Sequence, residues 1–377
     1  MSKKILYLVT EDWYFLSHRL PLALATQKKG YEVYVACKDT GKIDLIKQHN
    51  FNCFNLNIQR GTFSFFAILK NVIEIRKVIK KTNISILHAV SVQSIILGLL
   101  AIFFNHKIKF VATLTGLGTF FLAKSIKEKI IKLFLTLFFI LNFKKTNTKI
   151  IVQNKDDKNY VNKILLCPKS KISLIRGSGV DINLHKFIEE PPHPPIILSY
   201  VGRLIKDKGV ENLIEAFKRA YAKNKNIKLI LAGSLDTNNI RPISKKYIEN
   251  NSKSNIEFLG EVEDIREIWK VSHIAVLLSK REGLPKSLLE AAASGRAIIS
   301  TDVPGSREIA INSVNAILVK KNDIEEISKA ILLLAARHDL RKSYGLKSRE
   351  LVESDMSEEY VIKNTLSLYK SLYEKIS

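Results

Sequence analysis

The chain has 377 residues, of which 46 % are hydrophobic, and it carries a formal net charge of +24. This length exceeds what one hydrophobic core usually holds, so we expect two globular domains. The positive charge favours an anionic partner, such as nucleic acid, an anionic membrane or a phosphorylated substrate. Because no basic patch with interleaved aromatic residues and no zinc-finger spacing occurs, we do not expect nucleic acid to be the partner.

The cysteines and the N-terminal sequence indicate a reducing compartment. Cys37, Cys53 and Cys167 are too few and too scattered for a disulfide framework or a structural zinc site. The first residues lack the long apolar core and the small-residue cleavage site of a signal peptide. We therefore expect a cytoplasmic protein.

Short apolar runs alternate with longer helical patterns along the whole chain. This alternation predicts the α/β class, with parallel sheets that carry helices on both faces. In the first half we expect strands near residues 4–10, 32–37, 51–57, 84–90, 109–115, 148–154 and 171–177. In the second half we expect them near residues 196–202, 226–233, 256–260, 274–279, 297–301 and 316–319.

Two polar residues follow the first predicted strand, at its expected turn into the first helix. These residues, His18 and Arg19, would face the ligand cleft of a Rossmann-like domain and could meet an anionic acceptor. The alternative for His18 is a hydrogen-bonded loop histidine. His88 ends another apolar strand, and we expect it to be packed or hydrogen-bonded.

Two apolar segments come nearest to membrane character. Residues 95–104 and 130–143 both fall short of the roughly 18 to 20 apolar residues that span a bilayer. The wider segment 121–145 carries several lysines. It either lies in the membrane interface as a basic amphipathic helix or forms a buried crossover helix, and the sequence leaves both interpretations open.

The proline-rich segment 189–195 predicts a linker, because it is stiff and incompatible with a helix. We expect an N-terminal Rossmann-like domain over 1–190 and a C-terminal one over 191–357. The periodic segment 358–377 is expected to pack back on the first domain. Two doubly wound parallel sheets would then enclose a cleft, where such sheets bind ligands.

The second domain opens with a strand, a glycine turn and a helix. Gly202 and Gly209 bracket this turn, which places Arg203 and Lys208 at the carboxyl end of the sheet. The two cations could clamp a diphosphate, Arg203 as a planar fork and Lys208 as a point charge. The alternative is a pair of solvated surface charges.

A second loop at the same edge carries two carboxylates. We expect Glu282 in the loop and Glu290 on the following helix, with Pro285 at its first position and Gly295 at its left-handed end. Carboxylates accept hydrogen bonds from vicinal hydroxyls, so one could hold a ribose and the other a hexose. The unpaired amides at the helix start would favour a phosphate, and they belong to Lys286, Ser287 and Leu288. The alternative is a solvated helix face with ordinary capping.

Several motifs are absent from the sequence. No Asp-x-Asp, His-Glu-x-x-His or Cys-x-x-Cys occurs, and Gly116-Leu117-Gly118 is not completed to a dinucleotide fingerprint. These absences favour diphosphate binding without a metal. The charge on a leaving diphosphate would be neutralised by the two cations and the helix start.

Together these motifs resemble the retaining glycosyltransferases of family four, which have the GT-B fold. In the C-terminal half the resemblance rests on Gly202-Arg203, Lys208-Gly209, the pair Glu282 and Glu290, and the pattern from Gly295 through Thr301-Asp302 and Pro304-Gly305 to Glu308. In the N-terminal half the chain resembles a bacterial surface-polysaccharide branch, through the segments 10–21, 113–118, 153–157 and 177–181. The resemblance covers essentially the whole chain.

The resemblance implies a role for each matched residue. Arg203 and Lys208 would hold the donor diphosphate, Glu290 the nucleotide ribose and Glu282 the hydroxyls of the donor sugar. The remaining donor contacts would come from Gly202, Gly283, Leu284, Pro285 and the base-lining residues Leu259 and Val262. Acceptor contacts would come from His18, Arg19, Thr115 and Gly116. Many relatives carry a histidine where this chain has Thr115, so the resemblance implies no histidine-assisted step there.

The resemblance implies a retaining glycosyltransferase that needs no metal or other cofactor. It would move a hexose or N-acetylhexosamine from a nucleotide diphosphate, UDP, to a polyprenyl-diphosphate-linked saccharide. The enzyme would lie on the inner face of the plasma membrane, held by an anionic membrane surface. Two alternatives are a UDP-sugar 2-epimerase of the same fold and a non-catalytic nucleotide-sugar-binding subunit of a polysaccharide assembly complex.

Overall fold

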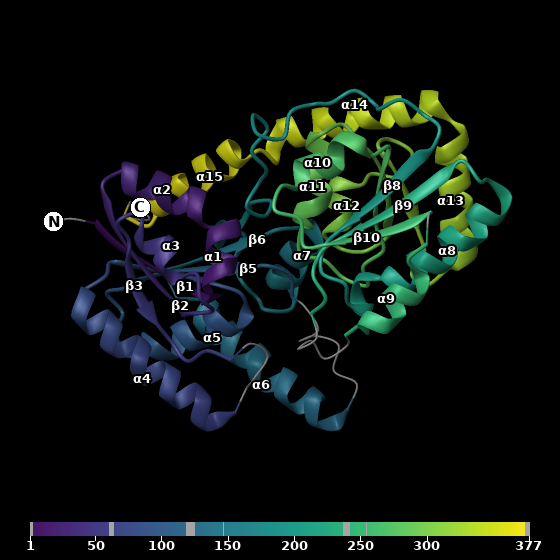
Figure 1. The fold of residues 1–377 in the computed structure, drawn as a ribbon. Coiled ribbons are helices and arrows are strands. Elements are labelled where there is room, and N and C mark those ends of the chain that lie inside the picture. Colours follow the sequence, from purple (N-terminus) through teal and green to yellow (C-terminus); the bar gives the residue numbers. More distant parts are fainter. Residues whose placement is uncertain are drawn as a thin grey trace. The chain divides into compact units, whose positions relative to one another are not determined.

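The computed structural model describes residues 3–59, 64–117, 125–145, 147–236, 242–253 and 255–373. The chain forms two compact units (Figure 1). Unit 1 comprises Met1–Ser178 and Glu359–Ser377, and unit 2 comprises Gly179–Glu358. The functional boundaries expected near residues 190 and 357 stay predictions.

Unit 1 is built on a parallel sheet of seven strands. The strands are β1 (Lys3–Glu11), β2 (Tyr31–Lys38), β3 (Asn52–Asn55), β4 (Ile86–Val90), β5 (Lys109–Leu114), β6 (Thr148–Val152) and β7 (Ile172–Leu174). Their order is β3-β2-β1-β4-β5-β6-β7, and every neighbouring pair is parallel. The order reverses direction at β1 and β4, which is the switch point where doubly wound sheets bind ligands.

Alternating side chains of the strands build a core on each face of this sheet. On β1, Leu6 and Leu8 face one core, whereas Ile5, Tyr7 and Val9 face the other. The first core is covered by α4 (Phe65–Thr82), α5 (Val92–Ala101), α6 (Ile126–Phe143) and α7 (Lys155–Lys163). The second is covered by α1 (Asp12–His18), α2 (Leu20–Lys28), α3 (Ile43–Lys47) and α15 (Glu358–Ser371). The period-two pattern of the strands therefore produces two helix layers.

The last helix, α15, belongs to unit 1 although it ends the chain. Its Tyr369 is fully buried, and the hydroxyl lies 2.6 Å from Nδ1 of His88 and 3.2 Å from the hydroxyl of Tyr7. The other ring nitrogen of His88 lies 2.7 Å from the Thr113 hydroxyl. His88 is thus packed and hydrogen-bonded, as its position at the end of an apolar run predicts.

Unit 2 contains a parallel sheet of six strands in the order β10-β9-β8-β11-β12-β13. The strands are β8 (Ile196–Val201), β9 (Ile227–Ala232), β10 (Ile256–Gly260), β11 (Ile274–Leu277), β12 (Ala297–Thr301) and β13 (Ala316–Val319). The helices are α8 (Val210–Lys223), α9 (Lys245–Asn251), α10 (Ile265–Val271), α11 (Lys286–Ala293), α12 (Ser306–Ile309), α13 (Ile324–Ala336) and α14 (His338–Asp355). All thirteen strands that the apolar runs predict are present, so the expected α/β class with two parallel sheets is confirmed.

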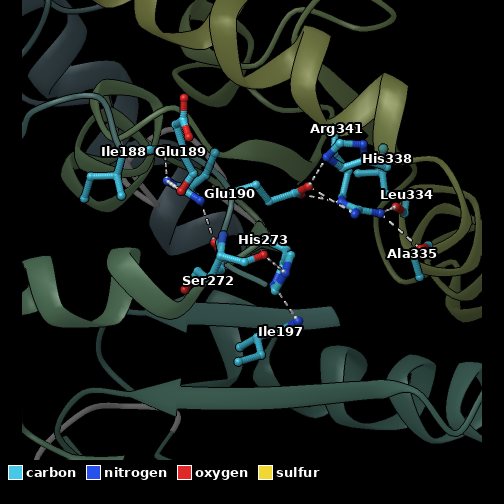
Figure 2. Close-up of polar contacts among 12 residues, drawn as sticks. Ile188, Glu189, Glu190, Ile197, Ser272, His273, Leu334, Ala335, His338 and Arg341 are labelled. Carbon is cyan, nitrogen blue, oxygen red and sulfur yellow. Dashed lines mark hydrogen bonds and ion pairs between the residues drawn. The ribbon is translucent and has the colours of Figure 1, made fainter. Parts of the chain in front are cut away.

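The segment that precedes β8 is anchored within unit 2 by charged side chains. Figure 2 shows Glu190 between His338 and Arg341, and its Oε2 lies 3.1 Å from a nitrogen of each. The ring of His273 accepts a hydrogen bond of 3.0 Å from the Ile197 amide. Arg296, which is buried, donates to the carbonyl oxygens of Ser272, Ile188 and Glu189. These contacts fix the chain where it enters the second sheet.

No helix within the described parts of the chain is long and apolar enough to cross a bilayer.

Candidate active site

The candidate site lies in unit 2, where three loops leave the carboxyl ends of β8, β9 and β11. The first loop begins at Gly202, directly after β8, and includes a short 3-10 turn over Lys206–Lys208. Tyr200, fully buried below it, donates a hydrogen bond of 2.7 Å to the Arg203 carbonyl. This hydrogen bond therefore fixes the loop to the core of the unit.

Arg203 is held by a carboxylate from the neighbouring loop. Its Nη1 lies 2.7 Å from Oδ2 of Asp236, in the loop that follows β9, and both side chains are partly buried. The sequence predicts Arg203 at this edge, whereas Asp236 was not among the predicted site residues. The signal that could have found it is a Gly-Ser-x-Asp run directly after a predicted strand.

Lys208 and Glu282 contact one another directly, although they lie 74 positions apart in the sequence. Nζ of Lys208 lies 2.5 Å from Oε1 of Glu282, and the Glu282 side chain is only 10 % exposed. Lys208 and Arg203 are thus partly buried and ion-paired, and their role toward a ligand stays a prediction. Each of the two cations has a carboxylate partner.

Gly209 makes this contact possible. It has a positive φ of +74°, and a Cβ built on it would lie 2.2 Å from the carbonyl oxygen of Leu278, just past the end of β11. Only glycine permits both the left-handed backbone and this close approach. The first loop can therefore close onto the end of β11 and bring Lys208 to Glu282.

Glu282 lies in the loop between β11 and α11, as predicted. This loop rests on Gly305, whose φ is +81° and whose added Cβ would meet the carbonyl oxygens of Gly283 and Glu282 at 2.4 and 2.7 Å. The helix start differs by one residue from the prediction. Pro285 has an extended ψ of 115° and is the N-cap, so that α11 begins at Lys286.

The first turn of α11 points backbone donors out of the helix, because first-turn amides have no acceptor within it. In α11 this turn comprises Lys286, Ser287 and Leu288. The Leu288 side chain is fully buried in the core, so only its backbone is available to a ligand. At the other end, Gly295 has a φ of +74°, which confirms the predicted left-handed termination.

Glu290 lies on α11 and is buried, with its side chain 7 % exposed. Burial raises the pKa of its carboxyl to about 7, and the Lys286 ammonium, 3.8 Å away, opposes that shift. A solvated helix face with ordinary capping does not describe this residue. A buried carboxylate near its pKa at neutral pH is instead typical of a group that meets a ligand.

Two further predicted contacts lie on the β10 side of this edge. Leu259, near the end of β10, is 39 % exposed. Val262 packs against the small cluster of Ile230, Ala232 and Ile268. Leu284 is partly buried against the main core of unit 2, and its backbone belongs to the Glu282 loop. Their roles as ligand contacts stay predictions.

The predicted acceptor residues lie in unit 1. Thr115 and Gly116 directly follow β5, and Gly118 falls outside the described residues. His18 ends α1, where its ring stacks on Tyr14 with centroids 4.5 Å apart and its Nδ1 lies 2.6 Å from the Ser17 hydroxyl. We expected His18 and Arg19 at the turn from strand to helix. Because α1 begins directly at Asp12, they lie instead at the junction of α1 and α2.

No cluster of three or more histidine, cysteine, aspartate or glutamate side chains suited to a metal ion occurs among the residues that the structure describes. The described site can bind anions through Arg203, Lys208 and the start of α11. It can bind hydroxyl groups through Glu282 and Glu290. These capacities are those that a nucleotide sugar requires.

Comparisons with known proteins agree with this chemistry. Residues 181–351 match the model of the family described as glycosyl transferases group 1, and residues 4–154 match that of the glycosyl transferase 4-like family. The capsular polysaccharide biosynthesis glycosyltransferase CapM of Staphylococcus aureus is 25 % identical, over 99 % of this chain and 98 % of the relative. An N,N'-diacetylbacillosaminyl-diphospho-undecaprenol alpha-1,3-N-acetylgalactosaminyltransferase of Campylobacter jejuni is also 25 % identical, over 96 % and 99 %.

Solved structures share the fold over almost the whole chain. A sucrose-phosphate synthase from Thermosynechococcus elongatus superposes with a TM-score of 0.80 at 18 % identity, covering 98 % of this chain and 99 % of its own. A glycosyltransferase from Rickettsia africae superposes with a TM-score of 0.76 at 19 % identity, covering 99 % of each chain.

The two parallel α/β sheets and the matched family models define a glycosyltransferase of the GT-B class. Within that class, the chain belongs to the glycosyltransferases of family four.

Proposed function

We propose that this enzyme is a retaining, metal-independent glycosyltransferase of surface polysaccharide biosynthesis. It transfers the hexose or N-acetylhexosamine of a UDP-sugar to a saccharide linked to a polyprenyl diphosphate. The main support for the donor is the contact between Lys208 and Glu282 beside the start of α11. Support for the acceptor comes from the names of two relatives, the Campylobacter enzyme above and an Escherichia coli UDP-Gal:alpha-D-GlcNAc-diphosphoundecaprenol alpha-1,3-galactosyltransferase. The second is 26 % identical over 80 % of this chain and 79 % of the relative.

In this proposal the donor is held at three points. Arg203, Lys208 and the first-turn amides of α11 bind the diphosphate, on which negative charge develops as the glycosidic bond breaks. Glu290, as a carboxylate, accepts hydrogen bonds from the ribose hydroxyls. Glu282 accepts hydrogen bonds from the transferred sugar, and its contact with Lys208 aligns the sugar pocket with the phosphate pocket.

Retention follows from attack on the same face that the leaving group occupies. The acceptor hydroxyl approaches the anomeric carbon, and the departing donor phosphate takes its proton. Such a path requires no nucleophile from the protein. The side chains supply orientation and charge stabilisation, which are the contributions that the paired loops of unit 2 can make.

The deciding experiment combines UDP-sugars with a short polyprenyl-diphosphate saccharide and measures product by mass. Wild-type protein should form one elongated acceptor and UDP. Glu282→Ala and Lys208→Ala should each lower turnover by at least roughly tenfold, as expected when a preorganised charge is lost. Arg219→Met is the matched control, since this side chain is half-exposed on α8 and pairs with Glu215 of the same helix.

The same assay separates the alternatives. A 2-epimerase would interconvert UDP-sugars without an acceptor, and a binding subunit would show saturable donor binding without product. Either result contradicts the proposed transfer. Wild-type rates in both variants would show that the donor-site assignment is wrong.

The proposed lipid acceptor requires the enzyme to reach a membrane, and α6 offers a surface for this. The outward side of α6 carries large apolar side chains at helical spacing, with Phe134 68 % and Leu141 70 % exposed. The stripe consists of Ile126, Ile130, Leu133, Phe134, Leu137 and Leu141. The opposite side packs Phe139 and Phe143 into the core. The helix is therefore both a core helix and an exposed amphipathic one, so the two interpretations of 121–145 are compatible over its described residues.

Unit 1 also carries aromatic side chains that lie beside cations. Nζ of Lys145, just after α6, lies 5.1 Å from the ring centroid of Phe103, and the guanidinium of Arg76 on α4 lies 6.0 Å from that of Phe104. Phe104 is 82 % exposed. Apolar side chains flanked by cations suit the interface of an anionic bilayer, with the apolar groups among the acyl chains and the cations on the headgroups.

We propose this face as the docking surface for the inner leaflet of the plasma membrane. Binding to vesicles that contain anionic lipid should weaken as salt rises, because the headgroup attraction is screened. Sedimentation with vesicles of neutral and of anionic lipid measures this. Absent or salt-independent association would contradict the proposal.

A further inference from the structure

Arg19 is a buried cation, and two of its three guanidinium nitrogens have no hydrogen-bond acceptor among the described residues. Its side chain is 3 % exposed, and its Nε and Nη2 are buried and contact no hydrogen-bond acceptor in the described parts of the chain. A buried guanidinium is strongly unfavourable unless it is paired, because it has lost its hydration. Such a group in a native protein requires an explanation, and a bound anion is the simplest one.

The nearest acid in the sequence does not supply the missing partner. Asp12, at the start of α1, is buried, and its Oδ1 accepts a hydrogen bond of 2.7 Å from the Trp13 amide. Its Oδ2 accepts from the amides of Thr40 and Lys42, at 2.7 and 2.8 Å. Asp12 thus holds the loop after β2 and does not pair with Arg19.

The polar side chains near Arg19 form hydrogen bonds with one another. The hydroxyls of Tyr7 and Thr26 lie 2.9 Å apart, and Tyr369 joins Tyr7 to His88. Burial lowers the pKa of His88 well below its usual value, and the nearby Arg19 charge lowers it further. His88 is therefore neutral, and it adds no charge that could balance the guanidinium.

The position of Arg19 in the fold points to a ligand from the carboxyl edge of the sheet. Arg19 follows β1 after the single short helix α1. Strand β4 is the neighbour of β1, and β5 lies next to β4. The helix α5 begins directly after β4, and Thr115 and Gly116 directly follow β5. Arg19 therefore lies one short helix away from the switch point of the sheet, the region where doubly wound domains bind their ligands.

We infer that Arg19 binds a phosphate oxygen of the diphosphate in the acceptor, and so selects acceptors that carry a diphosphate. The inference rests on the proposed transfer to a polyprenyl-diphosphate saccharide. The guanidinium has donors in a planar fork that matches phosphate, and binding would complete its missing hydrogen bonds. Arg19 is thus a specificity residue for the acceptor, separate from the donor cations Arg203 and Lys208.

The first test compares two acceptors that carry the same saccharide, one on a polyprenyl diphosphate and one on a plain alkyl chain. With saturating donor, Arg19→Met should lower kcat/KM for the diphosphate acceptor by roughly 10- to 100-fold, which is the usual effect of losing a charge-assisted hydrogen bond. The rate with the alkyl glycoside should stay the same. Arg19→Lys should fall between, and the control Arg219→Met should change neither. An equal loss on both acceptors, or no loss on either, would overturn the inference.

A binding measurement keeps this test independent of the proposed function. If wild-type protein transfers sugar to neither acceptor, the proposed function fails. Inorganic pyrophosphate is then titrated into the protein with saturating UDP present, so that the donor diphosphate site is filled. Binding by wild type that Arg19→Met weakens at least roughly tenfold would support the inference. Equal binding by both proteins, or none, would overturn it.

The second test uses stability, which separates ligand binding from a structural role. Without a ligand, Arg19→Met should raise the urea midpoint of unfolding, because an unpaired buried charge is replaced by an apolar side chain of similar length. A residue that held the fold together would show the reverse. A lower midpoint in Arg19→Met than in wild type would therefore count against the anion site.

Discussion

The two units of this enzyme differ in whether their cations are paired with acceptors. In unit 2 each cation of the candidate donor site is paired, Arg203 with Asp236, Lys208 with Glu282 and Lys286 with Glu290. In unit 1 the buried Nε and Nη2 of Arg19 have no acceptor among the described residues. The donor site is thus electrostatically complete before a ligand binds, whereas the edge of unit 1 is not.

The two units illustrate two ways in which a protein can prepare charged groups for a ligand. Paired charges hold each other in place, so the cations of unit 2 are positioned in advance and a diphosphate only has to join them. An unpaired buried charge destabilises the empty protein, and its ligand restores the balance. Unit 1 also leaves the apolar stripe of α6 in solvent, so two of its features are unfavourable in the protein alone, and the proposed lipid-linked acceptor and membrane would relieve them.

The largest effect should come from the glycine that closes the paired site of unit 2. Gly209→Ala places a Cβ 2.2 Å from the Leu278 carbonyl and forces alanine into a left-handed backbone. We expect the free energy of unfolding to fall by about 2 to 4 kcal/mol, and donor turnover to be lost with the Lys208–Glu282 contact. Urea unfolding and the transfer assay measure the two effects.

Gly260→Ala is the matched control for stability. Its φ is also positive, at +70°, but an added Cβ meets nothing within 4 Å. Only the backbone penalty of about 1 to 2 kcal/mol should remain. Equal losses in the two variants would show that the contact with β11 is unimportant.

The next largest effect should be a change of stability with pH. It comes from Glu290, the carboxyl group that we propose to bind the ribose. Its pKa is raised to about 7 in the folded protein, from an ordinary value of 4.5. Between these values the folded state binds more protons than the unfolded state, so this contribution to stability is present below pH 4.5 and is lost as pH rises through 7. Glu290→Gln removes the titration, and the difference in unfolding free energy between the two proteins should change by up to about 3 kcal/mol between pH 4.5 and 8.

Donor binding should follow the opposite direction. The proposed ribose contact needs the ionised carboxylate, so the KM for the UDP-sugar should rise as pH falls below 7 in wild type but not in Glu290→Gln. Unfolding curves and donor KM values at pH 5, 6, 7 and 8 test both trends. A flat stability difference would show that Glu290 is not the titrating group.

The smallest effect should come from the exposed face of unit 1. Phe134→Ser removes a large apolar group from the outward side of α6 without touching the core residues Phe139 and Phe143. Vesicle binding should weaken roughly 30-fold, because about 2 kcal/mol of apolar burial is lost. Transfer to a short, water-soluble acceptor should stay unchanged. Leu333→Ser on α13, where the side chain is 47 % exposed, is the control and should not affect vesicle binding.

The sequence predicted the framework well because strand patterns are local. Runs such as Ile274–Leu277 are apolar on both faces, which marks a strand of a buried parallel sheet. The errors occurred where the local signal is weak. The seven-residue helix α1 begins directly at the end of β1, so His18 and Arg19 lie one helix further along than expected. Pro285 is the N-cap rather than the first helical residue, because its ψ is extended.

The sequence by itself determined the α/β class, the strands of both sheets and the edge at which Arg203, Lys208, Glu282 and Glu290 would meet. These follow from hydrophobic period and from the rule that parallel strands share a carboxyl edge. Only the tertiary structure decided which charges pair, since Lys208 meets Glu282 across 74 residues through the close approach of Gly209 to β11. It also decided that Glu290 and Arg19 are buried. Burial depends on which segments, distant in the sequence, cover a side chain. A local sequence pattern does not show whether a charged side chain is paired.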